Sequence, residues 1–322
     1  MSEAGVLPPL VSVVMGVYNS ASTLVANLDS ILAQQDVDFE FIVIDDGSTD
    51  ATAQLLDTRA AADARLRVVH QPNAGLTQAL VAGCALARGR FIARQDSDDV
   101  SLPGRLQAQA QWLQAHGDAV LVGCDYELVG PRGELLRVRR GQADGVADLL
   151  DRHGRSVPGP HHGTVMFRRD AYERAGGYRP AFYFAQDIDL WSRLLEVGEL
   201  GYVPEVLCRV TFDPGSITGR HRAAQQRLRE LSLQGAAARR AGASDEPFVQ
   251  QAAAIRPQRG ADSDAAARAQ VAAAYFVASC LFDRADGRAR GYLRDVVRQS
   301  PGHWRAWSKL LASHLRGHRY AR

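Results

Sequence analysis

Residues 91–99 read FIARQDSDD, a short apolar strand that runs directly into a cluster of acidic residues. Three carboxylates lie within four positions, at Asp96, Asp98 and Asp99. Because like charges repel, such a cluster is best tolerated in water or around a cation, and its oxygen ligands suit Mg²⁺ or Mn²⁺. An isolated motif of this kind is better interpreted as an acidic surface turn, so the residues around it decide between the two.

Apolar strands and amphipathic helices alternate along the first half of the chain. With helices between them, strands are expected at 10–17, 39–44, 67–70, 91–95 and 119–124. This alternation predicts an α/β fold with a mostly parallel sheet flanked by helices. Ligands bind beyond the carboxyl ends of the strands in such sheets, and Asp45 and Asp46 end one strand as Asp96 follows another. Both acidic clusters are therefore expected at the same edge.

The region that follows is less regular. The sequence predicts a hairpin over 127–140, a strand over 161–167, a short helix over 170–177 and an amphipathic helix over 187–196.

Composition places the protein among ordinary globular chains. It has 322 residues, of which 46% are hydrophobic and 23% charged, and its four cysteines are too far apart in sequence to indicate a disulfide framework or a zinc site. The amino terminus has no basic cluster, and the longest apolar run, 271–282, is too short to span a bilayer. These features predict a cytoplasmic protein.

Charge divides the chain into two parts. Residues 219–322 hold 19 Arg and Lys against 8 Asp and Glu, a net charge of +11. The remaining 38 − 19 = 19 basic and 36 − 8 = 28 acidic residues give 1–218 a net charge of −9. We therefore predict a domain over 1–218 and a basic helical region over 219–322, with helices at 225–240, 265–282, 292–299 and 303–318 and a loop at 242–260.

Four segments together resemble the family 2 glycosyltransferases, which have the GT-A fold. They are SVVMGVYNSASTL at 12–24, FEFIVIDDGSTDAT at 39–52, NAGLTQALVAGCALARGRFIARQDSDDVSLPGRL at 73–106, and HGTVMFRRDAYERAGGYRPAFYFAQDIDLWSRL at 162–194. The resemblance implies an inverting, metal-dependent hexosyltransferase that uses Mg²⁺ or Mn²⁺. It would move a sugar from a nucleotide diphosphate sugar to an acceptor hydroxyl, in cell-surface polysaccharide or glycolipid synthesis.

The resemblance also implies roles for residues that would bind the donor. Val17, Tyr18 and Asn19 match the segment that packs the nucleotide. Asp46 matches the carboxylate that accepts a hydrogen bond from N3–H of uracil or thymine, a donor that cytosine lacks, which favours a UDP-sugar.

In the acidic cluster, Asp98 matches the direct metal ligand of the family, and Asp96 matches a ribose or water-mediated contact as well as a possible second ligand. Arg94 is expected to contact the sugar or the phosphates. An ion pair with Asp96 is an equally good interpretation of this arginine.

Asp187 matches the catalytic base of the family, although Gln186 stands where the family usually has Glu. A carboxylate within reach of the acceptor hydroxyl takes its proton as the new bond forms. The loss of one neighbouring charge is expected to lower the pKa of Asp187 somewhat. Asp189 is the second candidate for the base, and its alternative role is to stabilise the start of the helix or to bind Arg193.

Two histidines precede the 161–167 strand, and neighbouring strand residues point to opposite faces. The resemblance places His162 and Gln186 on the acceptor side of the site, whereas a structural histidine is an equally good interpretation of His162. Asp213 stands where the family often has a histidine near the diphosphate, and its alternative role is to initiate a turn before Pro214.

The last helix places Trp304, Trp307, Leu311 and Leu315 on one stripe. This stripe is expected to pack as a core contact over the catalytic domain. The alternatives are contact with an anionic membrane, which suits a lipid-linked acceptor and a peripheral location at the inner face of the cell membrane, and binding to a protein partner. No nucleic-acid-binding module is recognisable.

Other nucleotide-binding enzymes do not fit the sequence. The first strand is followed by MGVYNS and not by GxGxxG, and no GxxxxGK[ST] motif is present, which excludes a dinucleotide-dependent dehydrogenase and a P-loop enzyme. A non-catalytic protein that binds sugar nucleotides on the same fold remains the alternative function.

Overall fold

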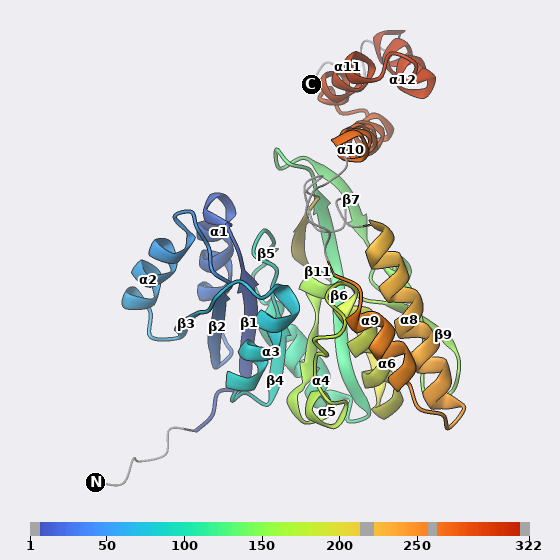
Figure 1. The fold of residues 1–322 in the computed structure, drawn as a ribbon. Helices are drawn as coiled ribbons and strands as arrows, with labels where there is room; N and C mark the ends of the chain where they lie inside the picture. Colours follow the sequence, from blue (N-terminus) through green and yellow to red (C-terminus); the bar gives the residue numbers. More distant parts are fainter. Residues whose placement is uncertain (1–6, 213–221, 257–262, 316–322) are drawn as a thin grey trace. The chain divides into compact units, whose positions relative to one another are not determined.

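The computed structural model describes residues 7–212, 222–256 and 263–315 (Figure 1). Its first half alternates strands and helices as predicted. The strands are β1 (Val11–Val17), β2 (Phe39–Asp45), β3 (Leu66–His70) and β4 (Phe91–Arg94), and the helices are α1 (Ala21–Leu32), α2 (Thr52–Ala62) and α3 (Leu76–Leu86). The strands form because runs of β-branched and aromatic residues are buried on both faces, as all seven residues of β1 and of β2 are.

The remaining elements follow in chain order. The strands are β5 (Val100–Ser101), β6 (Ala119–Val129), β7 (Leu135–Arg139), β8 (Ala147–Leu150), β9 (Ser156–Gly159), β10 (Met166–Arg168) and β11 (Glu199–Thr211). The helices are α4 (Arg105–Ala115), the 3₁₀ turn η1 (His162–Thr164), α5 (Arg169–Arg174), α6 (Gln186–Val197), α8 (Arg222–Arg240), α9 (Glu246–Ala253), α10 (Ser263–Asp283), α11 (Ala289–Gln299) and α12 (Trp304–Leu315).

The main sheet is mixed. Its strand order is β3-β2-β1-β4-β10-β6-β11-β5, with β7 paired to β6, while β8 and β9 form a separate two-stranded sheet. The predicted parallel arrangement holds for the pairs β3–β2, β2–β1 and β1–β4. β10 is antiparallel to both of its neighbours, β4 and β6, so β10 alone runs opposite to the strands on either side of it.

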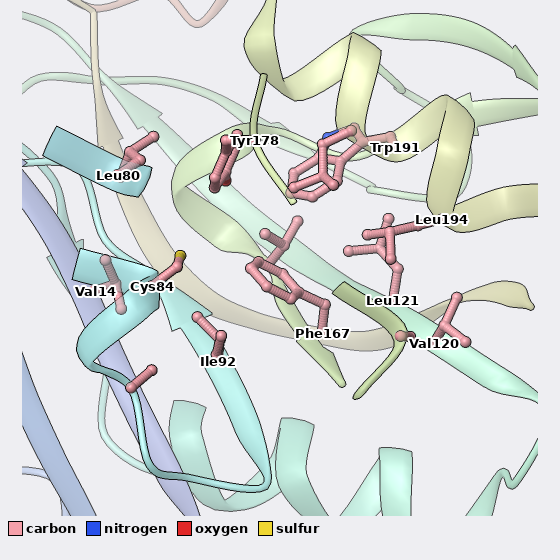
Figure 2. Close-up of a cluster of buried hydrophobic side chains, with 14 of the residues drawn as sticks. Val14, Leu80, Cys84, Ile92, Val120, Leu121, Phe167, Tyr178, Trp191 and Leu194 are labelled. Atoms are coloured by element: carbon pink, nitrogen blue, oxygen red, sulfur yellow. The ribbon is translucent and has the colours of Figure 1, made fainter. Parts of the chain in front are cut away.

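Aromatic and aliphatic side chains from both halves of the sheet share one core (Figure 2). Trp191 of α6 is fully buried and packs with Phe167 of β10, with 6.0 Å between ring centroids. On the parallel side, α3 contributes Leu80 and Cys84 to the same cluster. Helices α3 and α6 therefore pack against the sheet on opposite sides of β10. The buried face of α6 fixes the position of its first turn.

The second half departs from the predicted elements in three places. The predicted strand over 161–167 is wrong at its start, because His162–Thr164 forms a 3₁₀ turn and only Met166–Arg168 is a strand. The predicted loop over 242–260 contains α9, which has Pro247 in its first turn. The long strand β11 was not predicted, since Gly201 and Pro204 interrupt its apolar pattern.

The chain divides into two compact units, and the division differs from a boundary at residue 218. The first unit holds the main sheet, except for the end of β6 and most of β7, together with 224–256, which includes α9 and most of α8. Among the described residues, the second unit consists of 127–138, 211–212, 222–223 and 263–315. Its core is built by α10, α11 and α12 together with Leu136 of β7.

Within the described ranges, no helix is both long enough and apolar enough to cross a bilayer. Asp213 and Pro214 lie outside the described residues.

Candidate active site

Strand direction brings distant segments to one edge of the sheet. β1 is parallel to β2 and to β4, with Val17 opposite Asp45 and Val14 opposite Arg94, so their carboxyl ends share an edge. β10 is antiparallel to β4, with Met166 opposite Ala93, so the amino end of β10 and the preceding turn η1 lie at that edge too. The edge therefore combines the acidic residues that follow β4 with the histidines that precede β10.

Asp96, Asp99 and His161 form a group that can hold a metal ion. One ligand atom from each lies within 4.8 Å of the others. Gly163 passes close to both carboxylates, because a β-carbon on this residue would lie 2.5 Å from Oδ2 of Asp99 and 2.6 Å from Oδ2 of Asp96. Two carboxylate oxygens therefore converge at one point beside an imidazole. This oxygen and nitrogen donor set fits Mn²⁺ or Mg²⁺.

Arg94 contacts this group through Asp96. Its side chain is 1% exposed, and Nη2 donates to Oδ1 of Asp96 over 2.6 Å. Burial alone would raise the pKa of Asp96, but the charge of Arg94 lowers it below the ordinary value and keeps the carboxylate ionised. Nε and Nη1 of Arg94 are buried and have no hydrogen-bond partner among the described residues. Two N–H groups of this buried guanidinium thus lack a partner among the described residues, which is costly in an apolar environment.

The predicted metal ligands match this group only in part. Asp96 is a member, whereas the half-buried Asp98 is not, and Asp99 and His161 take the other positions. His161 was missed because, in the strand predicted over 161–167, only one of the two histidines could face the site, and the resemblance placed His162 there. The 3₁₀ turn instead lets His161 lie beside the carboxylates while His162 turns into the core.

His162 is held as a structural residue would be. Its Nε2 lies 2.8 Å from Oη of Tyr178, and its ring meets Trp191 edge-on with 5.8 Å between centroids. Burial, followed by the charge of Arg94, holds the pKa of His162 well below its usual range, so the imidazole is neutral. The predicted role of His162 on the acceptor side stays a prediction.

Asp187 begins α6 as a half-buried carboxylate. Its Oδ1 accepts from the backbone N–H of Ile188 over 2.9 Å. Burial raises the pKa of Asp187 above that of an ordinary aspartate, and the charge of Asp96 adds to this increase while Arg94 opposes it. A carboxylate whose pKa is raised is a stronger base, which suits removal of a proton from a hydroxyl. The preceding residue, Ala185, adopts a left-handed conformation with φ of 54°.

Gln186 and Asp189 lie near Asp187 in the sequence, and both are buried. Gln186 is 8% exposed, and Asp189 is 1% exposed. Asp189 accepts from Arg179 through both oxygens and from Nη2 of Arg193 over 2.6 Å. The role of Asp189 as an ion-pair partner of Arg193 is therefore confirmed, and its carboxylate is already engaged on both sides. Of the two candidate bases, the geometry favours Asp187.

Asp46 is tied to the loop that precedes α3. Its Oδ1 accepts from Nε2 of Gln71 over 2.7 Å and from the backbone N–H of Ala74 over 2.9 Å, and its Oδ2 accepts from the N–H of Gly75 over 2.7 Å. A carboxylate has about four acceptor sites, so these bonds leave room for one further donor at Oδ2. Gly75 has φ of 92°, and a β-carbon there would lie 2.6 Å from the ring of Tyr183. A glycine is therefore required at this position.

The segment after β1 is hydrogen-bonded to the loop that follows β2. Asn19 has φ of 49°, and its Oδ1 accepts from the backbone N–H of Thr49 over 2.7 Å. Val17 is buried, whereas the ring of Tyr18 is 49% exposed. An exposed aromatic ring next to a fixed loop is available to stack on a ligand.

Comparison with known proteins agrees with this arrangement. Residues 12–176 match glycosyl transferase family 2. The chain is 36% identical to glycosyltransferase EpsE of Bacillus subtilis over 222 residues, which cover 64% of this chain and 74% of EpsE. It is 28% identical to chondroitin synthase of Pasteurella multocida over 199 residues, where it spans only a fifth of that enzyme.

Solved structures share the fold at low sequence identity. A mannosyltransferase from Pyrobaculum calidifontis, solved with GDP-Man and Mn²⁺, gives a TM-score of 0.56 at 21% identity, covering 96% of this chain and 86% of its own. Residues 1–349 of S. aureus TarS, solved with UDP, give 0.51 at 17% identity, covering 97% and 93%. The extent of the sequence match and the mixed sheet with its acidic edge lead to one conclusion: this chain belongs to glycosyltransferase family 2 and is a glycosyltransferase with the GT-A fold.

Proposed function

We propose that this glycosyltransferase is metal-dependent and inverting, and that it transfers a sugar from a UDP-sugar to an acceptor hydroxyl. The observation that supports it best is the convergence of Asp96, Asp99 and His161 into one group, with Asp187 close enough to Asp96 for the charge of Asp96 to raise its pKa. The proposal assigns donor binding to the group of three and proton removal to Asp187.

Asp96, Asp99 and His161 would hold Mg²⁺ or Mn²⁺. When bound, such an ion offsets the negative charge that develops on the departing diphosphate. Arg94 holds Oδ1 of Asp96 and thereby directs the other oxygen toward the ion. Because the side chain of Arg94 is only 1% exposed, it would act on the donor through Asp96.

Asp187 would act on the acceptor. The acceptor oxygen forms a bond to the anomeric carbon while the bond from that carbon to the diphosphate oxygen breaks. The electron pair of the broken bond leaves with the diphosphate, and the acceptor proton passes to the carboxylate of Asp187. A single displacement of this kind inverts the configuration at the anomeric carbon.

Asp46 supports the choice of a uracil nucleotide. Its remaining acceptor site at Oδ2 would take the N3–H of uracil, while the exposed ring of Tyr18 would pack against the base. The acceptor would be a glycan or a lipid-linked molecule, and Gln186 and His162 are proposed to lie on its side of the site.

Nucleotide-dependent thermal unfolding tests the donor site. We expect UDP to raise the midpoint only when Mn²⁺ is present, and dTDP, GDP and CDP to raise it less. A ligand at about 100 times its Kd stabilises a protein by about 2.7 kcal/mol, which is readily measured. Asp99→Asn should abolish the metal-dependent shift, and Asp98→Asn, the matched control, should retain it. Absence of any shift with all four nucleotides, with and without metal, would contradict the proposal.

A further inference from the structure

Helix α12 exposes a row of large apolar side chains. Trp304 is 69% exposed, Trp307 44%, Leu311 61% and Leu315 89%. Their spacing of three, four and four residues places all four on one face, which extends over about 16 Å of helix. Contiguous exposed apolar surface of this kind marks an interaction site more often than scattered apolar residues do. We call these four residues the α12 face.

The α12 face is not needed to hold the helix in its own unit. The opposite side of α12 buries Ala306, Leu310 and Ser313. Arg290 of α11 donates to the backbone carbonyl of Ser313 over 2.5 Å, and Ala306 and Leu310 belong to the core built by α10 and α11. The helix is thus fixed by one side only. Trp304 and Trp307 are therefore not part of the core of their own unit, and the expectation that they pack over the catalytic domain stays a prediction.

Basic residues predominate in the segment that carries the α12 face. Residues 289–322 contain eight Arg and Lys and a single acidic residue, Asp295. Arg305 is exposed, and its guanidinium lies over the ring of Trp304, 5.3 Å from its centroid. Arg294 and Arg298 of α11 are exposed as well. Tryptophan and leucine beside arginine are the residues that helices present to the headgroup region of an anionic bilayer.

We propose that the α12 face docks the protein onto the surface of a bilayer that contains anionic lipids. The tryptophan rings and leucine side chains enter the boundary between headgroups and acyl chains, and the arginines contact lipid phosphates. Docking is reversible and falls as salt screens the charges. This inference goes beyond the proposed sugar transfer, since it concerns where the enzyme acts and uses none of the residues assigned to the donor site.

Vesicle co-sedimentation of the full chain tests the inference. We expect the protein to sediment with vesicles of phosphatidylcholine and phosphatidylglycerol, not with phosphatidylcholine alone, and to be released at high salt. Trp304→Ser combined with Leu311→Ser should weaken vesicle binding by at least about tenfold. Leu7→Ser combined with Val25→Ser is the matched control, because Leu7 and Val25 are also exposed apolar residues but lie far from α12 in sequence. The control should bind as the wild type does.

Other occupants of the α12 face give different results. If single-stranded DNA binds and the anionic vesicles do not, the face recognises nucleic acid and the inference is overturned. If the α12 variant changes only the oligomeric state, the face joins two copies and the inference is likewise overturned. The Mn²⁺-dependent shift with UDP should be the same in all of these variants. A loss of vesicle binding is therefore distinguishable from a failure of the proposed donor site.

Discussion

Asp187 and Asp189 lie two residues apart on α6 and have opposite surroundings. Asp189 is 1% exposed and is paired with Arg179 and Arg193, whereas the hydrogen bond resolved for Asp187 comes from the backbone of Ile188. One carboxylate is stabilised by buried positive charge, and the other is held where burial disfavours its ionised form. Asp189 therefore stabilises the fold, whereas Asp187 is the candidate base.

Replacing each aspartate by asparagine should give opposite results. Asp187→Asn should lower kcat by about 10²- to 10⁴-fold, because the general base is lost. Its folding stability should be unchanged or higher, since the variant removes a carboxylate whose ionised form is disfavoured by burial. Asp189→Asn should destabilise the protein by about 3 kcal/mol, because the buried Arg193 loses the charge of Asp189 and the half-buried Arg179 keeps only Asp245 as its partner. Turnover assays and thermal unfolding of both variants check this prediction, and full turnover by Asp187→Asn would contradict it.

The pH dependence of turnover should reflect the raised pKa of Asp187. A base must be unprotonated, so activity is lost as pH falls through its pKa in the folded enzyme. Because burial raises that pKa, the acid limb of log(kcat/KM) should lie above the value of about 3.9 for an unperturbed aspartate. The UDP-dependent shift in midpoint, measured over the same pH range, controls for loss of donor binding. A limb at or below the ordinary value contradicts the assignment.

Two glycines within helices provide a matched comparison of packing. On α3, a methyl group at Gly83 would lie 2.6 Å from Cγ1 of Val14, so this glycine allows the helix to approach β1 closely. On α11, the exposed Gly291 has no atom within 4 Å of that position. Gly83→Ala should destabilise the protein by about 1–3 kcal/mol through overpacking. Gly291→Ala should stabilise it by about 0.5–1 kcal/mol, because alanine favours the helix.

Denaturant unfolding of these two variants measures both effects. If Gly83→Ala is neutral, α3 can move away from β1, and the close packing that the structure shows is not required for stability.

The parallel half of the fold follows from sequence alone, whereas the antiparallel half does not. In β1 and β2 every residue is buried, so continuous apolar runs identify them. β10 has three residues, and β11 contains Gly201 and Pro204, so neither shows a clear period. Long-range pairing forms these strands, and a local pattern cannot report such pairing.

The same distinction applies to the candidate site. Asp46 and Asp96 were proposed because they follow strands, which is a local feature, and Asp187 was proposed from the resemblance to the family. His161 reaches Asp96 and Asp99 only because β10 inserts beside β4. A residue brought in by a distant strand leaves no signal in its own segment, and for that reason the sequence analysis assigned no histidine to the carboxylates.

The second unit of the molecule includes the tip of the β6–β7 hairpin. Leu136 is 1% exposed within the core of α10, α11 and α12. Glu134 is fully buried, and its Oε1 accepts from Oη of Tyr292 over 2.8 Å. The carboxyl-terminal helices therefore cover a segment that lies near the middle of the chain.

Truncation after residue 256 should consequently harm the remaining protein. Leu136 and Glu134 would lose their cover, and the exposed apolar hairpin should promote aggregation. Size-exclusion chromatography and binding of a hydrophobic dye compare this fragment with one that ends at residue 315, which keeps α10, α11 and α12 and serves as the control. A monomeric 1–256 fragment with an unchanged unfolding midpoint would show that the helical region is an independent appendage.

The position of β10 has a consequence for synthesis on the ribosome. β10 lies between β4 and β6, yet it emerges after both, when about half of the chain has been made. Until then β4 and β6 each present an open edge, which is the kind of surface that chaperones shield in nascent chains. The ribosome must synthesise His161 before Asp96 and Asp99 can gain the third member of the candidate metal group. The nascent polypeptide therefore joins β4 to β6 and assembles its candidate metal group in the same event, before β11 has been made.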